Sequence, residues 1–546
     1  MNWGPWVQIP PAPRFPSQPC LPVLIGQAGL RHCGIHPLFI PSSPGTGRQP
    51  VQSLAMTRVR LFHFDIPTWG NYGDKVLFPV VRDLFTGFGG GQAFEFTGAA
   101  PLRREVGFEL VERINATADA VVVGGGGLFL QDTNPNANSG WQWNISRAAL
   151  DRLEVPIIVF AVGDNRFPGQ PAFSDLFVDH VSAVAEKSVF FGLRNHGSMA
   201  SMADTLPDAV AANIEFQPCP TALGRLIYAG AQAEVAEQRR LAVQMLVQHR
   251  QRAAGYDAEA IHREVIAAVG QLAADGWQIV STPFHPDDRA FARALAEAVP
   301  EVVERRLYGP DVDFRAGYEL FASTPLVIGG RGHAQLIPFG AGSIPISLDL
   351  HNKLRYFASD VGHPELTLAA GPQGLRERIV ESATAAWQQR EALQTDLAAV
   401  QREWMEISET NLAGIYQALA GRPAPGESFA PISQQAAQRE SFHIAAAAEL
   451  EERRIVNDRQ HARTRNELQK TAAELDEARE RLEEAEKKLS EREAEAQRLG
   501  GELTDLRAEL DALHSRSFVS EAGAVVKRGI HGVAWRVRRL ARRVRR

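Results

Sequence analysis

The chain has 546 residues, 45% hydrophobic and 22% charged, so it can bury the cores of several domains. No apolar run is long enough for a transmembrane helix, and three cysteines exclude a disulfide framework and a cysteine-based zinc site and suit a reducing cytosol. The net charge of −6 is uneven, because residues 527–546 hold nine basic and no acidic side chains, which predicts an anionic partner for that segment.

Residues 1–55 differ from the rest of the chain. They hold 11 of the 33 prolines and have neither helical nor strand periodicity. The prolines interrupt every apolar stretch, which argues against a secretory signal. The first well-formed strand, at 59–66, begins shortly after Met56. We therefore interpret residues 1–55 as an overextended start with Met56 as the initiator, or as a disordered extension.

Strands and helices alternate from residue 56 to about residue 420. The apolar runs typical of buried strands are 59–66, 120–123, 156–161, 188–191, 241–247, 277–281, 325–329 and 344–348. Helical patterns lie between them, for example at 74–88 and 259–274. This alternation predicts an α/β fold with parallel sheets covered on both faces. The length exceeds one open sheet, so we expect two Rossmann-like domains, at 56–215 and 216–420, with a cleft between them.

A heptad repeat follows a linker at 421–447 and predicts a coiled coil over 448–515. Residues at seven-residue spacing are Leu468, Leu475, Leu482, Leu489, Ala496, Leu503 and Leu510. Small residues and Arg492 at the alternate core positions weaken the first half, and a solvated single helix is the alternative. A coiled coil would make the protein a homo-oligomer.

Residues 516–546 form a basic tail. A helix there places Val533, Val537, Leu540 and Val544 in one apolar stripe opposite arginines. This pattern is typical of an amphipathic helix on an anionic membrane surface, and nucleic acid is the rival partner. The stripe favours the membrane. We therefore expect a cytoplasmic protein that is peripheral on the inner face of the membrane.

Two glycine-bearing segments follow predicted strands of the first domain, where open α/β sheets bind ligands. They are 69–74, and 124–132 with four consecutive glycines. Glycines let backbone amides at a helix start approach an anion closely. Neither segment has the pattern of a dinucleotide or Walker loop, so NAD and ATP gain no support. Tight turns without a ligand are the alternative.

The third such segment, 327–333, carries more chemistry. Arg331 offers a planar fork for a carboxylate or phosphate, and His333 gives or takes a proton near neutral pH. Together they indicate an anionic substrate that undergoes proton transfer. The histidines lack metal-ligand spacing, so no metal is expected. Cys219, between two prolines, has no adjacent base and is interpreted as a buried hinge residue.

From about residue 58 to residue 361 the chain resembles the polysaccharide pyruvyl transferase family. The similar segments, in the family's order, are 71–74, 125–132, 193–198, 283–287 and 331–353. The family usually has an aspartate where this chain has Asn195.

The resemblance implies two domains in a GT-B-like arrangement. It also implies transfer of a pyruvyl group from phosphoenolpyruvate to sugar hydroxyls of a cell-surface glycan or its precursor, as a ketal. Phosphoenolpyruvate would be the donor substrate, and no cofactor is implied. His333 is the expected general acid toward the methylene carbon of the donor, with Arg331 on the donor anion.

The resemblance and the strand ends together suggest further substrate contacts. These are Asn71, Gly73, Asp74, Gly125, Gly126, Gly127, Asp132, Arg194, His285 and Lys353. A structural ion pair is the alternative role for Arg194, and helix capping is the favoured role for Asp74. Two other functions stay open: a GT-B-type glycosyltransferase that uses a nucleotide sugar, and a non-enzymatic scaffold.

Overall fold

The computed structural model describes residues 58–228, 238–426, 428–432, 434–516 and 523–544. The extension 1–55 and the proposed start at Met56 lie outside these residues.

The first sheet is parallel, with strand order β2-β1-β3-β4-β5-β6. Its strands are β1 (Val59–Asp65), β2 (Phe94–Pro101), β3 (Ala120–Phe129), β4 (Ile157–Asp164), β5 (Ser188–Leu193) and β6 (Ile214–Phe216). The helices are α1 (Tyr72–Gly91), α2 (Phe108–Thr117), α3 (Arg147–Arg152), α4 (Asp175–Glu186), α5 (His196–Ala203) and α6 (Asp208–Ala211). The central strands are buried on both faces, which explains their continuous apolar runs.

The second sheet is also parallel, with order β12-β11-β10-β7-β8-β9. Its strands are β7 (Arg240–Gln244), β8 (Gln278–Ser281), β9 (Val303–Glu304), β10 (Leu326–Gly329), β11 (Ile344–Leu348) and β12 (Thr367–Leu368). The α-helices of this half are α7 (Gly224–Ile227), α8 (His249–Ala253), α9 (Ala258–Ala274), α10 (Arg289–Ala298), α11 (Ala316–Ala322), α12 (His333–Ala341), α13 (Asn352–Asp360) and α14 (Leu375–Gln388). Three 3₁₀ turns complete it: η1 (Pro220–Leu223), η2 (Pro286–Asp288) and η3 (Pro364–Leu366). Two parallel sheets confirm the predicted α/β class.

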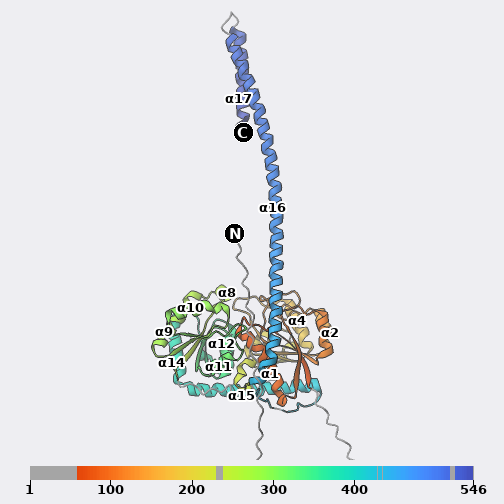
Figure 1. Ribbon diagram of the computed structural model, residues 1–546, viewed down its shortest axis with the longest axis vertical. Helices are drawn as coiled ribbons and strands as arrows, with labels where there is room; N and C mark the ends of the chain where they lie inside the picture. Colours follow the sequence, from red (N-terminus) through yellow and green to blue (C-terminus); the bar gives the residue numbers. More distant parts are fainter. Residues whose placement is uncertain (1–57, 229–237, 427, 433, 517–522, 545–546) are drawn as a thin grey trace, which may run out of the picture. The chain divides into compact units, whose positions relative to one another are not determined.

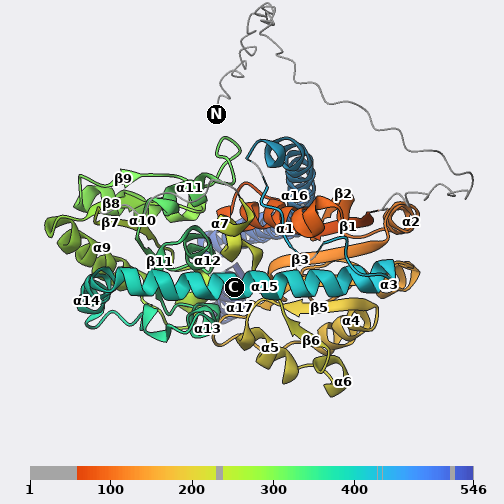
Figure 2. The same ribbon diagram turned by 90° about the horizontal axis from the view of Figure 1, so that it is seen from below.

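Helix α15 (Arg390–Ala420) lies across both halves (Figure 2). Asn411 donates to the backbone oxygen of Phe216 in the first half at 2.9 Å, and the Trp404 ring lies 5.4 Å from the ring of Phe339 in the second. The helix therefore fastens the two sheets to each other, a role that the sequence pattern does not reveal.

The C-terminal region is helical. Helix α16 (Gln434–Arg516) begins inside the expected linker, and α17 (Gly523–Val544) runs back along the end of α16 (Figure 1). Leu499 and Val533 are 4% and 2% exposed, and Val537 and Leu540 are half-buried, so this part of the tail's apolar stripe packs against α16. The stripe on which the membrane expectation rested is therefore covered by the chain itself at these positions. Across the described part of the chain, no helix combines the length and apolar character needed to span a membrane.

Candidate active site

The loop after β1 carries the start of α1 to the second half of the protein. Asn71 is the N-cap of α1: its side-chain oxygen accepts from the amide of Gly73 at 3.2 Å, and its amide donates to Asp74 at 2.7 Å. The expectation that Asp74 is the cap is therefore wrong. A Cβ at Gly73 would lie 2.1 Å from Nδ1 of His333, so only glycine lets that ring approach.

His333 is the first residue of α12, just after β10. Its Nε2 is buried and has no hydrogen-bond partner among the described residues. Burial, followed by the positive charges of Arg194, Lys353 and Arg331, lowers the pKa of His333 well below its usual value. The imidazole is therefore neutral at pH 7 in the free protein.

Arg331 is held firmly beside His333. Its Nε and Nη2 donate to one oxygen of Asp288 at 3.2 and 2.7 Å. The other oxygen of Asp288 accepts from the amide of Phe284 and the side chain of Gln244. The carboxylate thus fixes the guanidinium in place at the end of the second sheet.

Lys353, in the first turn of α13, reaches across to the first half. Its Nζ donates to the side-chain oxygen of Asn165 at 2.8 Å, and Nε2 of His351 lies 3.3 Å from the backbone oxygen of Asn165. Burial and the nearby charges of Arg194 and Arg331 lower the pKa of Lys353 to about 7. A Cβ at Gly127 would lie 2.6 Å from the Asn165 side chain, so this glycine makes room for the contact.

Arg194 follows β5 and is 7% exposed. Its Nε and Nη2 are buried without hydrogen-bond partners, and burial lowers its pKa. The structural ion pair considered for this residue is not found among the residues that the structure describes. A desolvated guanidinium with unused donors favours an anionic ligand, because burial without a partner costs free energy.

These residues converge on two adjoining hollows. The first, about 70 Å³, is lined by Asn71, Phe167, Leu246, Gln248, Gln251, Gly330, Arg331, Gly332, His333, His351 and Lys353. The second, about 20 Å³, is lined by Arg194 and shares Gly332 and Lys353 with the first. Two arginines and Lys353, whose pKa of about 7 leaves it partly protonated at neutral pH, thus lie near a neutral histidine. This arrangement can bind a small polyanion and present a proton donor to it.

The glycine run of β3 does not form the expected turn. Gly124–Gly127 lies inside the strand, and no helix begins after it. A Cβ at Gly124 would lie 2.2 Å from the backbone oxygen of Phe160, and one at Gly126 would lie 2.9 Å from Leu77. The glycines serve close approach of neighbouring elements, so the expectation of an anion-binding helix start is wrong.

Asp132 and His285 line neither hollow. Asp132 pairs with Arg250 at 2.8 Å and thereby joins the first half to α8. His285 caps the turn η2 by accepting from the amide of Asp287 at 3.2 Å. Both residues support the surroundings of the cavity instead of facing it. Cys219 is buried, as expected for a hinge residue, and burial raises the pKa of its thiol.

Sequence reasoning missed several residues of the first hollow and its rim: Asn165, Phe167, Gln248, Gln251 and His351. One signal was available, because the polar residues 164–166 lie at the carboxyl end of β4 and the carboxyl ends of parallel strands share one edge of a sheet.

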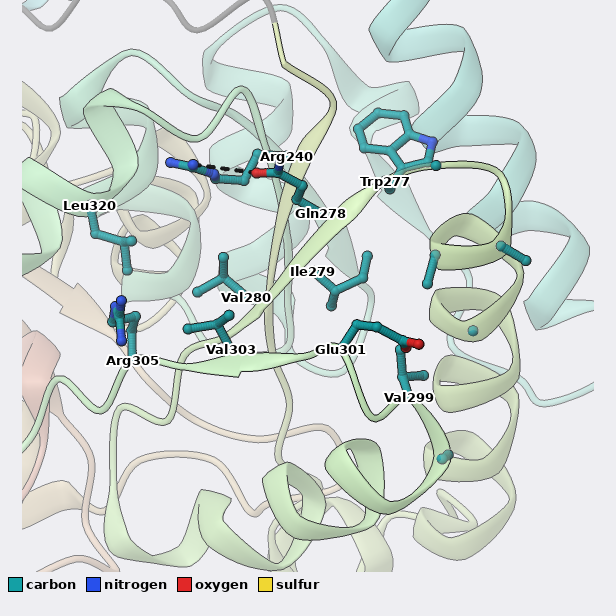
Figure 3. Close-up of a pocket in the computed structure, with 15 residues that line it drawn as sticks. Arg240, Trp277, Gln278, Ile279, Val280, Val299, Glu301, Val303, Arg305 and Leu320 are labelled. Carbon is teal, nitrogen blue, oxygen red and sulfur yellow. Dashed lines mark hydrogen bonds between the residues drawn. The ribbon is translucent and has the colours of Figure 1, made fainter.

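A wider groove of about 680 Å³ lies along the edge of the second sheet (Figure 3). Its floor is formed by apolar side chains of β8 and β9, including Ile279, Val280 and Val303, with the Arg240–Gln278 hydrogen bond at one side. It contains none of the predicted site residues. The smaller cationic cavity is therefore the better candidate for the chemistry.

Parallel-sheet halves with a cationic, histidine-bearing cavity are typical of enzymes that act on anionic substrates. The model of the polysaccharide pyruvyl transferase family matches residues 51–342, which is more than half of the chain. The chain therefore belongs to this family. Membership in this family supports the prediction that the protein is a transferase. No curated protein matches the sequence.

Similar solved structures have low identity to this chain. S. aureus MnaA in complex with UDP is 9% identical over 66% of this chain and 97% of its own, with a TM-score of 0.44. The UDP-GlcNAc 2-epimerase from Methanocaldococcus jannaschii is 10% identical over 60% and 92%, with a TM-score of 0.38. A Thermobaculum terrenum O-GlcNAc transferase is 12% identical over 73% and 71%, with a TM-score of 0.36.

Proposed function

We propose that the protein transfers a pyruvyl group from phosphoenolpyruvate to sugar hydroxyls of a cell-surface glycan or its precursor and forms a ketal. One observation carries this proposal beyond family membership: Arg194, Arg331 and Lys353 surround His333, whose Nε2 has no partner among the described residues. Phosphoenolpyruvate requires both features, because it is a small polyanion that must be protonated on carbon.

The basic side chains would bind different anionic groups of phosphoenolpyruvate. Arg331 is already oriented by Asp288, and Arg194 has unused N–H donors that suit a carboxylate or phosphate in bidentate fashion. Lys353 adds a point charge between the two hollows. No cofactor enters this scheme.

Binding of phosphoenolpyruvate would also allow His333 to become protonated, as acid catalysis requires. The negative charge of this donor offsets the positive charges that hold the pKa of His333 down, so donor binding raises that pKa and His333 takes up a proton. His333 delivers this proton to the methylene carbon, and the adjacent carbon becomes an oxocarbenium-like centre. The first sugar hydroxyl attacks that centre and its proton returns to His333. Phosphate then leaves, and the second hydroxyl closes the ketal while its proton departs with the phosphate.

Other predicted residues take supporting roles in this scheme. Asn71 lines the first hollow, where it can orient an acceptor hydroxyl, Asp74 accepts a hydrogen bond from Asn71, and Gly73 makes room for His333. Gly125–Gly127, Asp132 and His285 position the elements around the cavity. A glycosyltransferase that uses a nucleotide sugar remains the alternative, and it predicts a different ligand.

Thermal unfolding of the full chain separates the two functions. We expect phosphoenolpyruvate to raise Tm, because a ligand at 100 times its Kd stabilises by about 2.7 kcal/mol. UDP-, GDP- and CMP-linked sugars should have no such effect. Arg194→Met should abolish the shift, whereas Arg376→Met, an exposed position on α14, should keep it. Stabilisation by a nucleotide sugar alone would shift the assignment to glycosyl transfer.

We further propose that α17 holds this cytoplasmic protein at the inner face of the membrane. With the apolar stripe turned toward α16, the helix exposes Trp535 and a basic face, and the Arg539 guanidinium lies 5.3 Å from the Trp535 ring. The exposed arginines are Arg536, Arg538, Arg539, Arg542 and Arg543. Acidic lipid headgroups complement this face.

Truncation after residue 520 should abolish binding to vesicles that contain acidic lipids, because it removes the basic face. Binding of the full chain should weaken steeply as salt rises, because exposed charges are screened. Co-sedimentation measures both effects, with neutral vesicles as the control. Unchanged binding after truncation, or preferential binding of an oligonucleotide, would contradict the membrane proposal.

A further inference from the structure

Four leucines on α16 are solvent-exposed, and no other described segment of the single chain packs against them. Leu468, Leu475, Leu482 and Leu489 are 56–65% exposed, although they follow one another at heptad spacing. Beyond them the pattern changes, because Leu499 is buried and Leu503, Leu506, Leu510 and Leu513 are half-buried where α17 packs. Helix α16 thus has two zones: 499–513 is paired by the chain's own tail, and 468–495 is not.

The charges beside the exposed leucines identify a partner. In a parallel, in-register pair of heptad helices, a g residue lies next to the e residue five positions later on the other helix. Here these pairs are Glu474 with Arg479, Arg481 with Glu486, and Lys488 with Glu493. All three are of opposite charge, and each occurs twice in a pair of identical helices. The same side chains are exposed in the single chain.

The alternate core positions limit the number of helices. They are occupied by Thr471, Ala478, Ala485 and Arg492. The small side chains of Thr471, Ala478 and Ala485 let two helices approach closely, and they offer too little apolar surface for the wider core of a larger bundle. Arg492 would lie opposite its own copy and weakens the last heptad. Contacts inside the chain do not compete strongly, because the exposed Arg481–Glu477 and Lys488–Glu484 pairs of α16 contribute little.

We propose that a second copy of this chain covers the exposed leucines and forms with it a parallel, in-register two-stranded coiled coil over residues 468–495. The coiled coil ends where α17 begins to cover the apolar face of α16. This proposal goes beyond the catalytic function and does not depend on it. It gives the protein two active sites and two basic tails on the same side of the dimer.

Charge reversal in the full-length protein tests both partner and orientation. The g-reversed variant carries Glu474→Lys, Arg481→Glu and Lys488→Glu, and the e-reversed variant carries Arg479→Glu, Glu486→Lys and Glu493→Lys. In either variant alone all six interchain pairs become repulsive, so sedimentation velocity should show dimerisation weakened by about a hundredfold or more. Mixed together, with one of them tagged, the two variants should form a heterodimer, because all six pairs are attractive again.

Glu480→Lys/Lys487→Glu is the matched control. Both residues lie on the outward face of the same heptads, so this variant should remain as dimeric as the parent. Circular dichroism of every variant checks that α16 stays helical. A monomeric parent protein or a higher oligomer would overturn the proposal. A g-reversed variant that stays dimeric would also overturn it, because an antiparallel pair matches g with g and keeps the sign of each contact.

Discussion

His333→Gln should lower phosphate release from phosphoenolpyruvate by about 10²–10⁴-fold, the usual contribution of a positioned general acid. Glutamine approximates the size of imidazole but cannot take up and deliver a proton. The variant should stay folded, because Nε2 of His333 makes no hydrogen bond within the described structure that the substitution would break. Turnover with phosphoenolpyruvate and a sugar acceptor measures the loss, and Tm checks the fold.

His262→Gln is a suitable control. The Nε2 of His262 is likewise buried without a described partner, but this residue lies on α9, where its ring packs against Phe291. The control should therefore match His333→Gln in stability and retain activity. Full turnover in His333→Gln would remove this residue from the reaction, even if donor binding persisted.

Gly73→Ala should lower kcat by about 100-fold, the cost of displacing a catalytic group by about 1 Å. The added methyl would meet the His333 ring at 2.1 Å, so the ring must move. Overpacking should also destabilise the protein by about 1–3 kcal/mol. Turnover and thermal unfolding measure the two effects separately.

Two variants make this prediction specific. Gly70→Ala, in the same loop, has its nearest atom at 3.6 Å and should be close to neutral. In a His333→Gly background, which also removes the His333 Cβ that would lie 2.6 Å from the added methyl, the methyl has room, so Gly73→Ala should cause no further loss of activity or stability. Additive losses in the double variant would show that Gly73 acts through something other than the His333 ring.

Much of the fold was predictable because the deciding signals are local. The continuous apolar runs of β1, β3, β4 and β10 identify buried parallel strands, and α9 has a clear helical pattern. Strands β9 and β12 have two residues each, too few to show any period. Helix α15 was missed for another reason: its buried side chains keep the regular spacing of one helical face, but the polar Gln401 and Ser408 interrupt the apolar pattern of that face.

The same distinction applies to the site. Arg331 and His333 were found because they lie two positions apart in the sequence at a strand end. The contact of Lys353 with Asn165 joins residues 188 positions apart, and the approach of His333 to Gly73 depends on how the two halves meet. The glycines of β3 were misplaced because their role is steric. Glycine disfavours strands by itself, and only the neighbouring Phe160, Leu77 and Asn165 explain why it is needed there.

The length of α16 has a consequence for where acceptors are reached. With 83 residues at 1.5 Å each, the helix measures about 125 Å. In the membrane-bound state proposed above, it would keep the catalytic halves up to that distance from the surface that α17 binds. An enzyme held in this way could reach acceptors at a range of distances from the surface, and not only acceptors that lie on it. In that state, acceptors within this distance of the surface would meet a high local concentration of enzyme without being anchored themselves.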